Sequence, residues 1–597
     1  MSLIVQKFGG TSVANAEKIR VAARRAIRAQ QNGHQVVMVV SAMGKQTDVL
    51  VDLAKQITDD PSGREMDMLL STGAQVSVAL MAMAIHSLGA EAVSLTGAQI
   101  GIRTDSSHTK ARIQSISTER IKKLLDDGKI VIAAGFQGID EDFNITTLGR
   151  GGSDTTAVAL AAVLNADACE IYTDVDGVFT TDPRLVAEAR KMDRVSHDEI
   201  LELASLGAGV MHSRSIEFGK KFNVPIHVCN SQSFSDEPGT VIGSESESAD
   251  RAVTGAALTK NEAQITIAGV PDHPGASYTV FSKLAGVNVA VDMIVQNAGA
   301  DGSADISFTV LEDDLPKALA ASKQAANELG AESVLHDASL SKVSIVGLGM
   351  ATQTGVADRM FRALSDEGIN IEAITTSEIK VSVLVKREQA LAALRAVHSE
   401  FELDRAPSDR LRYGEVAGGK AASAAGRANP VDIVARLQRM EDLAIESVSL
   451  DESQAQMTLF DVPDRPGISA RIFEAVASEG ILVDTIVQSI GRDGLADISF
   501  TVPRKSVDEA RRVLKNLSAE LGGEVKDVPA VAILTVKGIG IRSHTGVGLR
   551  MFKALAEARI NVEMVSTSEI RVNVVVGADK AATGLAALKA AFADVLG

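Results

Sequence analysis

Two hydrophobic patterns divide the chain. Over the first 243 residues, continuous apolar runs such as 36–40 and 130–134 alternate with glycine-rich loops and helical stretches. Continuous apolar runs are typical of parallel strands that are buried on both faces. Ligands bind at the loops beyond the carboxyl ends of such strands, so these loops are the first candidates for a site. The pattern predicts an α/β domain with a mainly parallel sheet between helices.

The remaining residues repeat themselves. The segment 304–310 recurs at 496–502, an offset of 192 residues, and 376–379 recurs at 567–570, an offset of 191. Around each copy the pattern indicates a strand, a helix, two strands, a helix and a last strand, which predicts four βαββαβ modules in two tandem pairs. In every module a glycine is followed six residues later by Phe and seventeen residues later by an acid: Gly275/Phe281/Asp292, Gly355/Phe361/Glu372, Gly467/Phe473/Asp484 and Gly546/Phe552/Glu563.

These patterns place the domain boundaries. We expect the α/β domain at 1–243, the first two modules at 244–335 and 336–413, and the last two at 431–526 and 527–597. The segment 414–430, rich in Gly, Ala and Ser, predicts a flexible linker. A domain of about 70 residues has little core of its own, so we expect the modules to pair their sheets side by side.

Composition then narrows the classes of function. A formal net charge of −17 argues against a nucleic-acid partner. Two cysteines, Cys169 and Cys229, make a disulfide framework improbable and are predicted to be small core residues. The N-terminus has the pattern of a strand and not of a leader, and the apolar run 76–85 is too short for a membrane span and predicts a buried helix. We expect a cytoplasmic protein without a membrane partner.

Two glycine loops of the first part carry lysines. Lys7 is followed by Phe8, Gly9 and Gly10, an arrangement in which backbone N–H groups can approach phosphate oxygens while the lysine supplies a cation. An ordinary glycine turn beside a surface lysine is an equal alternative. The second loop, 41–48, follows a buried strand, but it is not a P-loop, because Val39 stands at the position of the first P-loop glycine and the lysine is followed by Gln46.

Two further loops are rich in polar side chains. Residues 147–155 place Arg150, Ser153 and Asp154 among three glycines at the head of the apolar helix 157–164, where an anion would be attracted. The alternative is that Ser153 or Asp154 only caps that helix. The loop 172–184 is rich in Asp and Thr and predicts a nucleotide cradle. A calcium loop is the alternative, although the EF-hand spacing and its terminal Glu are missing.

Together these motifs resemble the aspartate kinases of the amino-acid kinase family. The motifs are Lys-Phe-Gly-Gly-Thr-Ser at 7–12, Val-Ser-Ala-Met-Gly at 40–44, Gly-Phe-Gln-Gly at 135–138, Gly-Arg-Gly-Gly-Ser-Asp at 149–154 and Tyr-Thr-Asp-Val-Asp-Gly-Val at 172–178. The modules resemble ACT domains, and their number resembles the four-ACT form of these kinases. No dehydrogenase-like sequence follows, unlike in the bifunctional enzymes.

The resemblance implies ATP-dependent phosphorylation of L-aspartate to 4-phospho-L-aspartate, the first step toward lysine, threonine and methionine. ATP would enter with Mg²⁺, and no tightly bound cofactor or protein-held metal is expected. The resemblance assigns catalysis to Lys7 and Asp154. It assigns aspartate binding to Ser41, Thr47, Ala74, Phe136, Gln137, Arg150 and Ser153. It assigns nucleotide binding to Lys7, Phe8, Gly9, Gly10, Thr173, Asp174, Phe179 and Arg184.

Physical chemistry and three departures qualify this assignment. A carboxylate nucleophile, with an unperturbed pKa of about 3.9, needs no general base at neutral pH, so we expect Asp154 to position Lys7, the substrate ammonium group or the metal. Ala74 stands where the family has the Glu that receives that ammonium group, Gly209 stands where many relatives have Lys, and the basic residue usual near Cys229 is missing. An amino-acid sensor that keeps the kinase scaffold is the alternative, and a kinase for glutamate or a related acid is a weaker one.

ACT resemblance also implies lysine and threonine as effectors, bound between modules, and a homodimer formed through the ACT domains. One class of site would use Asp272, Gly275, Ser277, Val291, Asp292 and Gln296 with Asn370 and Ile371, and its repeat Asp464, Gly467, Ser469, Asp484 and Gln488. The other class would use Gln353, Gly355, Val356, Ser377 and Glu378, and its repeat His544, Gly546, Val547, Ser568 and Glu569. Relatives often carry Asn two residues before the Asp of the first module, where this chain has Ala290 and, in the repeat of that module, Leu482. Asn370 and Asn561 are retained in the second and fourth modules.

Overall fold

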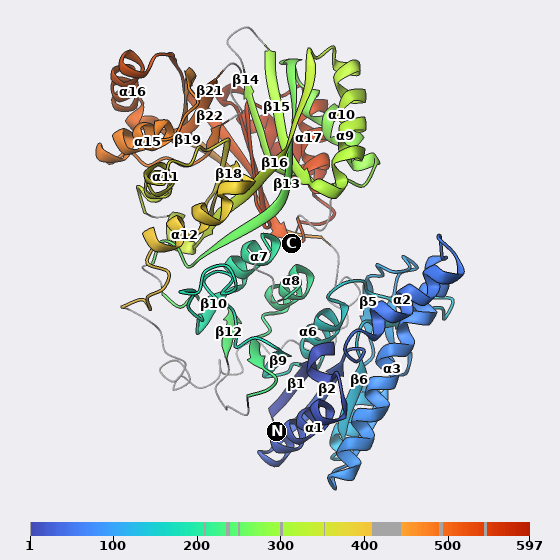
Figure 1. Cartoon of the computed structure of the whole chain (residues 1–597). Helices are drawn as coiled ribbons and strands as arrows, with labels where there is room; N and C mark the ends of the chain where they lie inside the picture. The colour runs from blue at the N-terminus through green and yellow to red at the C-terminus, as the bar shows by residue number, and fades with distance from the viewer. Residues whose placement is uncertain are drawn as a thin grey trace.

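The computed structural model describes residues 2–207, 211–233, 239–248, 251–298, 303–351, 353–408, 443–488, 494–541 and 546–596. Gly209, His544 and the predicted linker 414–430 lie outside the described residues. Figure 1 shows two halves stacked on each other, an N-terminal domain and a repeat half, with the last described residues close to the boundary between them.

The N-terminal domain is built on an eight-stranded sheet in the order β10-β12-β11-β9-β1-β2-β6-β3. Its neighbours pair in parallel except for β11 and β12. The prediction of a mainly parallel sheet is confirmed. The strands are β1 (Ser2–Phe8), β2 (His34–Val40), β3 (Ala92–Leu95), β6 (Ile130–Ala134), β9 (Ala168–Thr173), β10 (Arg194–Ser196), β11 (Ile226–Asn230) and β12 (Thr240–Gly243).

Helices cover both faces of this sheet because its central strands are apolar at consecutive residues, so that both faces have to be buried. Met38 and Val40 face one core and Val37 and Val39 face another. The first core is closed by α1 (Ala16–Gln31) and α3 (Gly63–Ser87), and the second by α5 (Glu119–Asp126), α6 (Gly152–Leu164), α7 (His197–Ser205) and α8 (Ser213–Phe222). Cys169 and Cys229 are buried free thiols, as predicted, and burial raises the pKa of Cys229 to about 12.

Helix α3 is only partly the buried helix that the sequence predicted. Met81 and Ile85 are fully buried, whereas Val76 and Met83 are exposed. By length and composition alone, α3 is the single described helix that could cross a membrane, and half of its apolar window is buried inside the domain. Two further helices are α2 (Gln46–Ile57), which packs on α3, and α4 (Gly97–Ile100), which contacts β4 and β7. These strands belong to a four-stranded sheet, β5-β4-β7-β8, of β4 (Ile102–Thr104), β5 (Ile113–Ile116), β7 (Gln137–Ile139) and β8 (Ile145–Thr147).

The repeat half forms one twelve-stranded sheet. Its first block contains β13 (Gly255–Pro271), α9 (Ala276–Gly286), β14 (Asp292–Ala298), β15 (Ser303–Leu311), α10 (Leu315–Leu329), β16 (Ser333–Val346), α11 (Val356–Asp366), β17 (Ala373–Ser377), β18 (Lys380–Lys386) and α12 (Ala390–Glu400). Its second block contains β19 (Ala444–Pro463), α15 (Ile468–Ser478), β20 (Ile486–Gln488), β21 (Leu495–Pro503), α16 (Val507–Leu521), β22 (Glu524–Ile539), α17 (Gly546–Glu557), β23 (Met564–Thr567), β24 (Arg571–Gly577) and α18 (Ala581–Ala591).

The two modules of a block share their long strands. The second half of β13 pairs with the first half of β16 in the first module, and the first half of β13 pairs with the second half of β16 in the second module. β19 and β22 do the same in the second block. For the second and fourth modules, the prediction of a last strand after the second helix is therefore wrong. Residues 401–408 form turns, and the closing strand comes from the start of the block.

The modules pair across the two blocks. The second and third modules, the inner pair, join their sheets where β17 is hydrogen-bonded to β20. The repeated phenylalanines mark the same pairing, since Phe361 packs on Phe473 with ring centroids 5.5 Å apart. The first and fourth modules form the outer pair, in which Phe281 stacks on Phe552 at 5.2 Å. Both module pairs are thus completed within one chain.

Candidate active site and effector pockets

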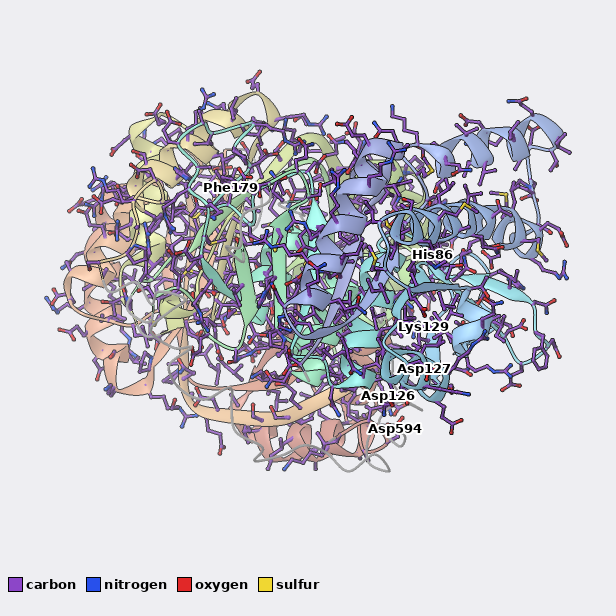
Figure 2. The ribbon with its side chains drawn as sticks, turned by 90° about the horizontal axis from the view of Figure 1, so that it is seen from below. His86, Asp126, Asp127, Lys129, Phe179 and Asp594 are labelled. Carbon is purple, nitrogen blue, oxygen red and sulfur yellow. The ribbon has the colours of Figure 1, made fainter. Side chains whose placement is uncertain are left out.

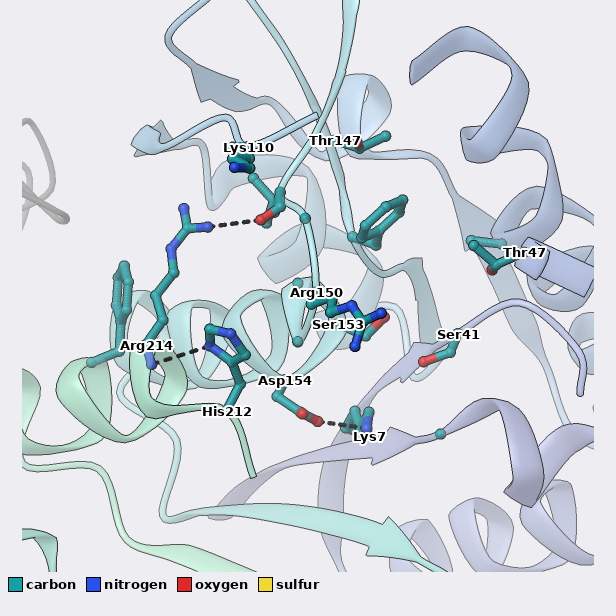
Figure 3. A pocket seen from close by; sticks show the side chains of 18 of the residues that line it. Lys7, Ser41, Thr47, Lys110, Thr147, Arg150, Ser153, Asp154, His212 and Arg214 are labelled. Carbon is teal, nitrogen blue, oxygen red and sulfur yellow. Dashed lines mark hydrogen bonds and ion pairs between the residues drawn. The ribbon is translucent and has the colours of Figure 1, made fainter. Parts of the chain in front are cut away.

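A cavity of about 960 Å³ lies where the sequence placed the ligand loops, beyond the carboxyl ends of β1 and β2 and at the head of α6. Residues from the first three candidate loops line it, among them Lys7, Ser41, Thr47, Arg150 and Asp154. Figure 3 shows these side chains converging from different elements on one space. A volume of this order is typical of a pocket for small-molecule ligands.

Lys7 and Asp154 form the central ion pair of this cavity, which we call the catalytic pocket. Lys7 Nζ lies 2.5 Å from Asp154 Oδ1, and both side chains are mostly buried (Figure 3). The pair forms because Lys7 lies near the carboxyl end of β1 and Asp154 lies in the first turn of α6. The helix is capped by Gly151 in a left-handed conformation, without a side-chain cap. The alternative that Ser153 or Asp154 is the N-cap is therefore wrong, and Asp154 is left to hold Lys7.

The glycines of the third loop are required by close packing. A Cβ atom on Gly151 would lie 2.3 Å from the Cβ of His212, and one on Gly152 would lie 2.9 Å from the ring of Phe136. Phe136 itself adopts a left-handed backbone with φ of 74°, a conformation that costs free energy in a non-glycine residue. Such strain is common at ligand sites. The loop at the head of α6 is thus tightly packed and leaves no room for side chains at Gly151 and Gly152.

Helix α8 fixes this loop from the other side. Arg214 Nη1 donates to the carbonyl of Leu148 at 2.8 Å and its Nη2 donates to the carbonyl of Ala111 at 2.8 Å. His212 caps α8 by accepting from the Arg214 backbone N–H, and burial followed by the charge of Arg214 lowers the pKa of His212, which keeps it neutral. Figure 3 shows both side chains beside Asp154 and Lys110. These residues hold the loop that carries Arg150.

The residues predicted for the substrate mostly meet in this pocket. Ala74 is almost fully buried on α3 and offers no charge to the pocket. Gln137 is the exception, because its side chain is buried and donates to the Ser71 carbonyl of α3 at 3.1 Å, away from the lining. The lining members of the predicted set are Ser41, Thr47, Ala74, Phe136, Arg150 and Ser153.

The residues predicted for the nucleotide divide into two groups. Lys7, Gly9 and Gly10 line the catalytic pocket, whereas Phe8 is buried under it and stacks on Tyr172 with centroids 4.7 Å apart. Thr173 follows directly on Tyr172, whose carbonyl accepts from the Gly9 N–H. The others lie along the loop away from the lining: Asp174 is exposed, Arg184 is paired with Asp182, and Phe179 bridges to Lys191.

The 172–184 loop extends away from the first helices of the domain. In Figure 2, Phe179 lies on the side of the molecule opposite to His86 and Lys129. Among the described residues there is no group of three or more His, Cys, Asp or Glu side chains arranged to hold a metal ion, so the calcium-loop alternative for 172–184 finds no support in that part of the chain.

Several lining residues were missed by the sequence analysis. These residues come from the turn before β5 and from α8. No glycine-rich motif marks them in the sequence, and only the tertiary fold brings them to the pocket. They are Lys110, Arg112, His212, Arg214, Glu217 and Lys221. The repeat half also reaches the pocket, through Ile539 and Gly540 of the fourth module.

A second cavity, of about 250 Å³, lies between the modules of the inner pair. The second module contributes Gln353, Gly355, Val356, Ser377 and Glu378, all of which were predicted together. The third module contributes Leu482 and also Asp484, which the sequence analysis had placed in the other class of site. We call this cavity the inner effector pocket. Burial, and then the nearby Asp451, raises the pKa of Asp484.

The other class of predicted site is also completed between modules, but with a different partner. Asn370 Nδ2 donates to Asp464 at 3.0 Å and Gln488 Nε2 donates to the Ile371 carbonyl at 2.9 Å. The prediction that Asn370 and Ile371 complete the site of Asp272 is therefore wrong. They lie in a small cleft with Gly467 and Ser469 of the third module.

The same arrangement is repeated in the outer pair. Asp272 accepts from Asn561 Nδ2 at 2.8 Å, and Gln296, held by Ser277, donates to the Val562 carbonyl at 2.7 Å. A cavity of about 100 Å³ beside it is the outer effector pocket, lined by Val291, Asp292, Ser568 and Glu569. Gly548 and Leu549 line it, whereas the predicted Gly546 and Val547 do not.

One acid of the outer pocket has an internal counter-ion. Lys342, 1% exposed, places Nζ 2.6 Å from Asp292 and 2.7 Å from Glu262. In the second block the equivalent positions on the strands are occupied by Ile533 and Gln454, so Asp484 has no such lysine beside it. The two effector pockets therefore have equivalent strands and helices but different side chains around their acids.

Comparison with known proteins agrees with this division of the chain. The amino acid kinase family model matches residues 2–230, and the ACT domain model matches 265–325, 343–401, 461–517 and 534–592. The aspartate kinase Ask_LysC of Stutzerimonas stutzeri is 51% identical over 406 residues, which cover 68% of this chain and 98% of that relative. The predicted fold class, an amino-acid kinase domain followed by four ACT domains, is confirmed.

Solved structures give the same result over a longer stretch. The aspartate kinase from Synechocystis is 40% identical, covers 99% of this chain and 98% of that chain, and has a TM-score of 0.52. Aspartokinase III of E. coli, solved with aspartate and ADP, is 24% identical over 67% of this chain and 99% of its own, with a TM-score of 0.56, and shares the fold. The N-terminal half is thus an amino-acid kinase domain. The chain belongs to the aspartate kinases.

Proposed function

We propose that the catalytic pocket transfers the γ-phosphoryl group of ATP to the side-chain carboxylate of L-aspartate. The observation that carries this is the buried Lys7–Asp154 pair at the head of α6, inside a cavity that also presents Arg150. A lysine beside a helix N-terminus stabilises the charge that develops on a transferring phosphoryl group. Arg150 is suited to a bidentate contact with the substrate carboxylate.

In the proposed reaction an oxygen of the aspartate side chain forms a bond to the γ-phosphorus, and the bond from that phosphorus to the ADP oxygen breaks. No proton has to be removed from the nucleophile, because a carboxylate is ionised at neutral pH. Asp154 then holds Lys7 in place. ATP would enter as its Mg²⁺ complex, with the metal on the phosphate oxygens, and the 172–184 loop would hold the nucleoside.

The direct test is aspartate-dependent release of ADP by the full-length chain, with hydroxylamine added to trap the acyl phosphate as a hydroxamate. We expect ADP and hydroxamate in equal amounts with L-aspartate. ADP release that does not depend on aspartate, or no release at all, would remove the proposal. The alternative of a sensor without turnover finds no support in the comparisons.

A gain of function is expected at Ala74. The family resemblance places a carboxylate for the substrate ammonium group here, and Ala74 supplies none. Ala74→Glu should raise kcat/KM for aspartate about tenfold or more, because a hydrogen bond to a charged group contributes roughly 1.5–3 kcal/mol. Ala74→Gln, of equal size and without charge, is the matched control. Equal kinetics of the two variants would show that charge at this position does not matter.

We further propose that lysine and threonine regulate the enzyme from the pockets between modules, in a cytoplasmic protein. Support comes from the acids that line these pockets and from the resemblance to ACT domains. The side-chain ammonium group of lysine suits Asp484 of the inner pocket. Because the module pairs are completed within one chain, the regulatory pockets do not depend on a dimer, and assembly through the ACT domains stays a prediction.

Lysine binding should weaken on acidification. The pKa values of Asp484 and Asp358, which both line the inner pocket, are raised mainly by burial. Each therefore takes up a proton at a higher pH than an ordinary aspartate, and the pocket loses its attraction for a cation as the pH falls. Calorimetry between about pH 8 and pH 5 measures this, because lysine keeps its own charges over that range.

Asp484→Asn should bind lysine about tenfold more weakly at the upper pH and lose most of the pH dependence. Norleucine, which lacks the side-chain ammonium group, is the ligand control, and its binding should not weaken on acidification. A wild-type lysine affinity that is constant across the range would count against the inner pocket as a cation site.

A further inference from the structure

Helix α7 lies at the boundary between the kinase domain and the repeat half (Figure 1). It carries Glu202, whose side chain is fully buried. Two modules bind this carboxylate at once. Lys380 Nζ of the second module lies 2.9 Å from Oε2, and the backbone N–H of Glu569 in the fourth module donates to Oε1 at 2.9 Å. One buried carboxylate of the kinase domain is thus shared by the inner and the outer pair.

The two contacts come from equivalent turns. Residues 377–380 of the second module and 568–571 of the fourth are copies of each other, 191 residues apart. Ile379 and Ile570, at the same position of each turn, are both buried in the core that contains Leu203 of α7. The turns also contact each other, because Arg571 is ion-paired with Glu378. Together the two turns hold α7 through two polar contacts, from Lys380 and the Glu569 N–H, and two apolar ones, from Ile379 and Ile570.

Each turn is also part of an effector pocket. Ser377 and Glu378 line the inner effector pocket, and Ser568 and Glu569 line the outer one. A ligand in either pocket therefore contacts a turn whose neighbouring atoms hold Glu202. If the turn moves to accommodate the ligand, the atoms that bind Glu202 move with it, and α7 is displaced.

Helix α7 in turn reaches the catalytic pocket through α8, on which it packs. His212 at the start of α8 lies against Gly151, and Arg214 holds the Leu148 carbonyl, so α8 fixes the loop that carries Arg150. Phe218 of α8 lines the pocket itself. The route from an effector pocket to the phosphoryl-transfer loop is therefore a short series of packed contacts.

The charge of the junction makes this contact sensitive to movement. Burial alone would lower the pKa of Lys380, but the carboxylates of Glu202, Asp292 and Glu569 raise it, so the lysine stays charged. Separating a buried carboxylate from one of its donors leaves charge without a partner, which is strongly unfavourable. A turn that moves must therefore carry α7 with it, or break the pair.

We propose that Glu202 is a positioning residue that transmits the occupancy of both effector pockets to α8 and the catalytic loop. The inference rests on the regulation by lysine and threonine proposed above. It does not require Glu202 to touch either the substrate or an effector.

The test is Glu202→Gln in the full-length chain, titrated with L-lysine and L-threonine in the aspartate-dependent assay and, separately, in a calorimeter. Glutamine keeps the shape and an acceptor for the Glu569 N–H but loses the charge that holds Lys380. We expect the amino acids to bind within about threefold of wild type, while the concentrations that halve activity rise about tenfold or more, the size of a typical allosteric coupling.

Arg395→Met is the matched control. Arg395 of α12 also bridges the two halves, by donating to the Leu185 carbonyl at 3.3 Å, but it lies on neither turn and on neither α7 nor α8. Inhibition of this control variant by lysine and threonine should stay that of wild type. If Glu202→Gln does not fold, as judged by thermal unfolding, Lys380→Met tests the same contact from the other side and should give the same separation of binding from inhibition.

Unchanged inhibition of Glu202→Gln or Lys380→Met would overturn the inference and leave the proposed regulation standing. The inference would also be overturned if Glu202→Gln lost effector binding in parallel with inhibition. That result would mean that Glu202 forms part of the effector pockets. A wild-type chain that binds neither amino acid would overturn the proposed regulation, and the junction with it.

Discussion

Lys7→Met is expected to lower the turnover of aspartate by about a thousandfold. Preorganised charge at a transferring group is among the largest contributions to catalysis, and removal of one such donor costs roughly 100- to 1000-fold in kcat. Lys7 is the cation that β1 delivers to the head of α6, 2.5 Å from Asp154. Aspartate-dependent ADP release under saturating substrates measures the effect.

Lys45→Met is the control for this variant. Lys45 lies in the second glycine loop and is exposed, and it is absent from the pocket lining. Its removal should leave turnover within about twofold of wild type, as for an ordinary surface substitution. If Lys7→Met kept a tenth of wild-type turnover or more, another cation of the lining, such as Arg150, would have to supply the main positive charge.

Asp154→Asn is expected to lower turnover about a hundredfold, less than loss of the lysine, because asparagine still accepts a hydrogen bond while the ion pair is lost. Since the nucleophile needs no base, the role of Asp154 is exerted through Lys7. Residues that act as a unit are not additive in their effects. The double variant of Lys7→Met and Asp154→Asn should therefore be no slower than Lys7→Met alone.

A double-mutant cycle on kcat decides between the possible roles of Asp154. Additive losses would mean that Asp154 contacts the substrate or the metal independently of Lys7. The pH profile of kcat provides a second readout, because a general base would make the rate of the wild type fall at low pH in a way that Asp154→Asn abolishes.

Much of this architecture could be predicted from the sequence because local patterns determine it. Continuous apolar runs marked the buried strands β2 and β6, and the repeated glycine–phenylalanine spacing marked four helices that bury Phe281, Phe361, Phe473 and Phe552. The glycine loops marked the catalytic pocket, because close backbone approach there leaves no room for a side chain, as at Gly151.

The remaining features depend on contacts between distant residues. Four copies of one pattern cannot indicate which copies pair, so the partners of Asn370 and Asn561 were not predictable. The sharing of β13 and β16 between modules was hidden for the same reason, since either half of a long strand has the pattern of a complete strand. Arg214 and His212 reach the pocket from α8 without any local signal.

Pairing of the modules across the two blocks has an evolutionary consequence. In a symmetric dimer of identical chains, every substitution appears on both sides of the interface, so equivalent sites must change together. In this chain the two halves of the regulatory unit are encoded by separate stretches of sequence. Lys342 and Glu262 accompany Asp292 in one pocket, while Ile533 and Gln454 accompany Asp484 in the other. Duplication has thus allowed two originally equal pockets to acquire different side chains within one polypeptide.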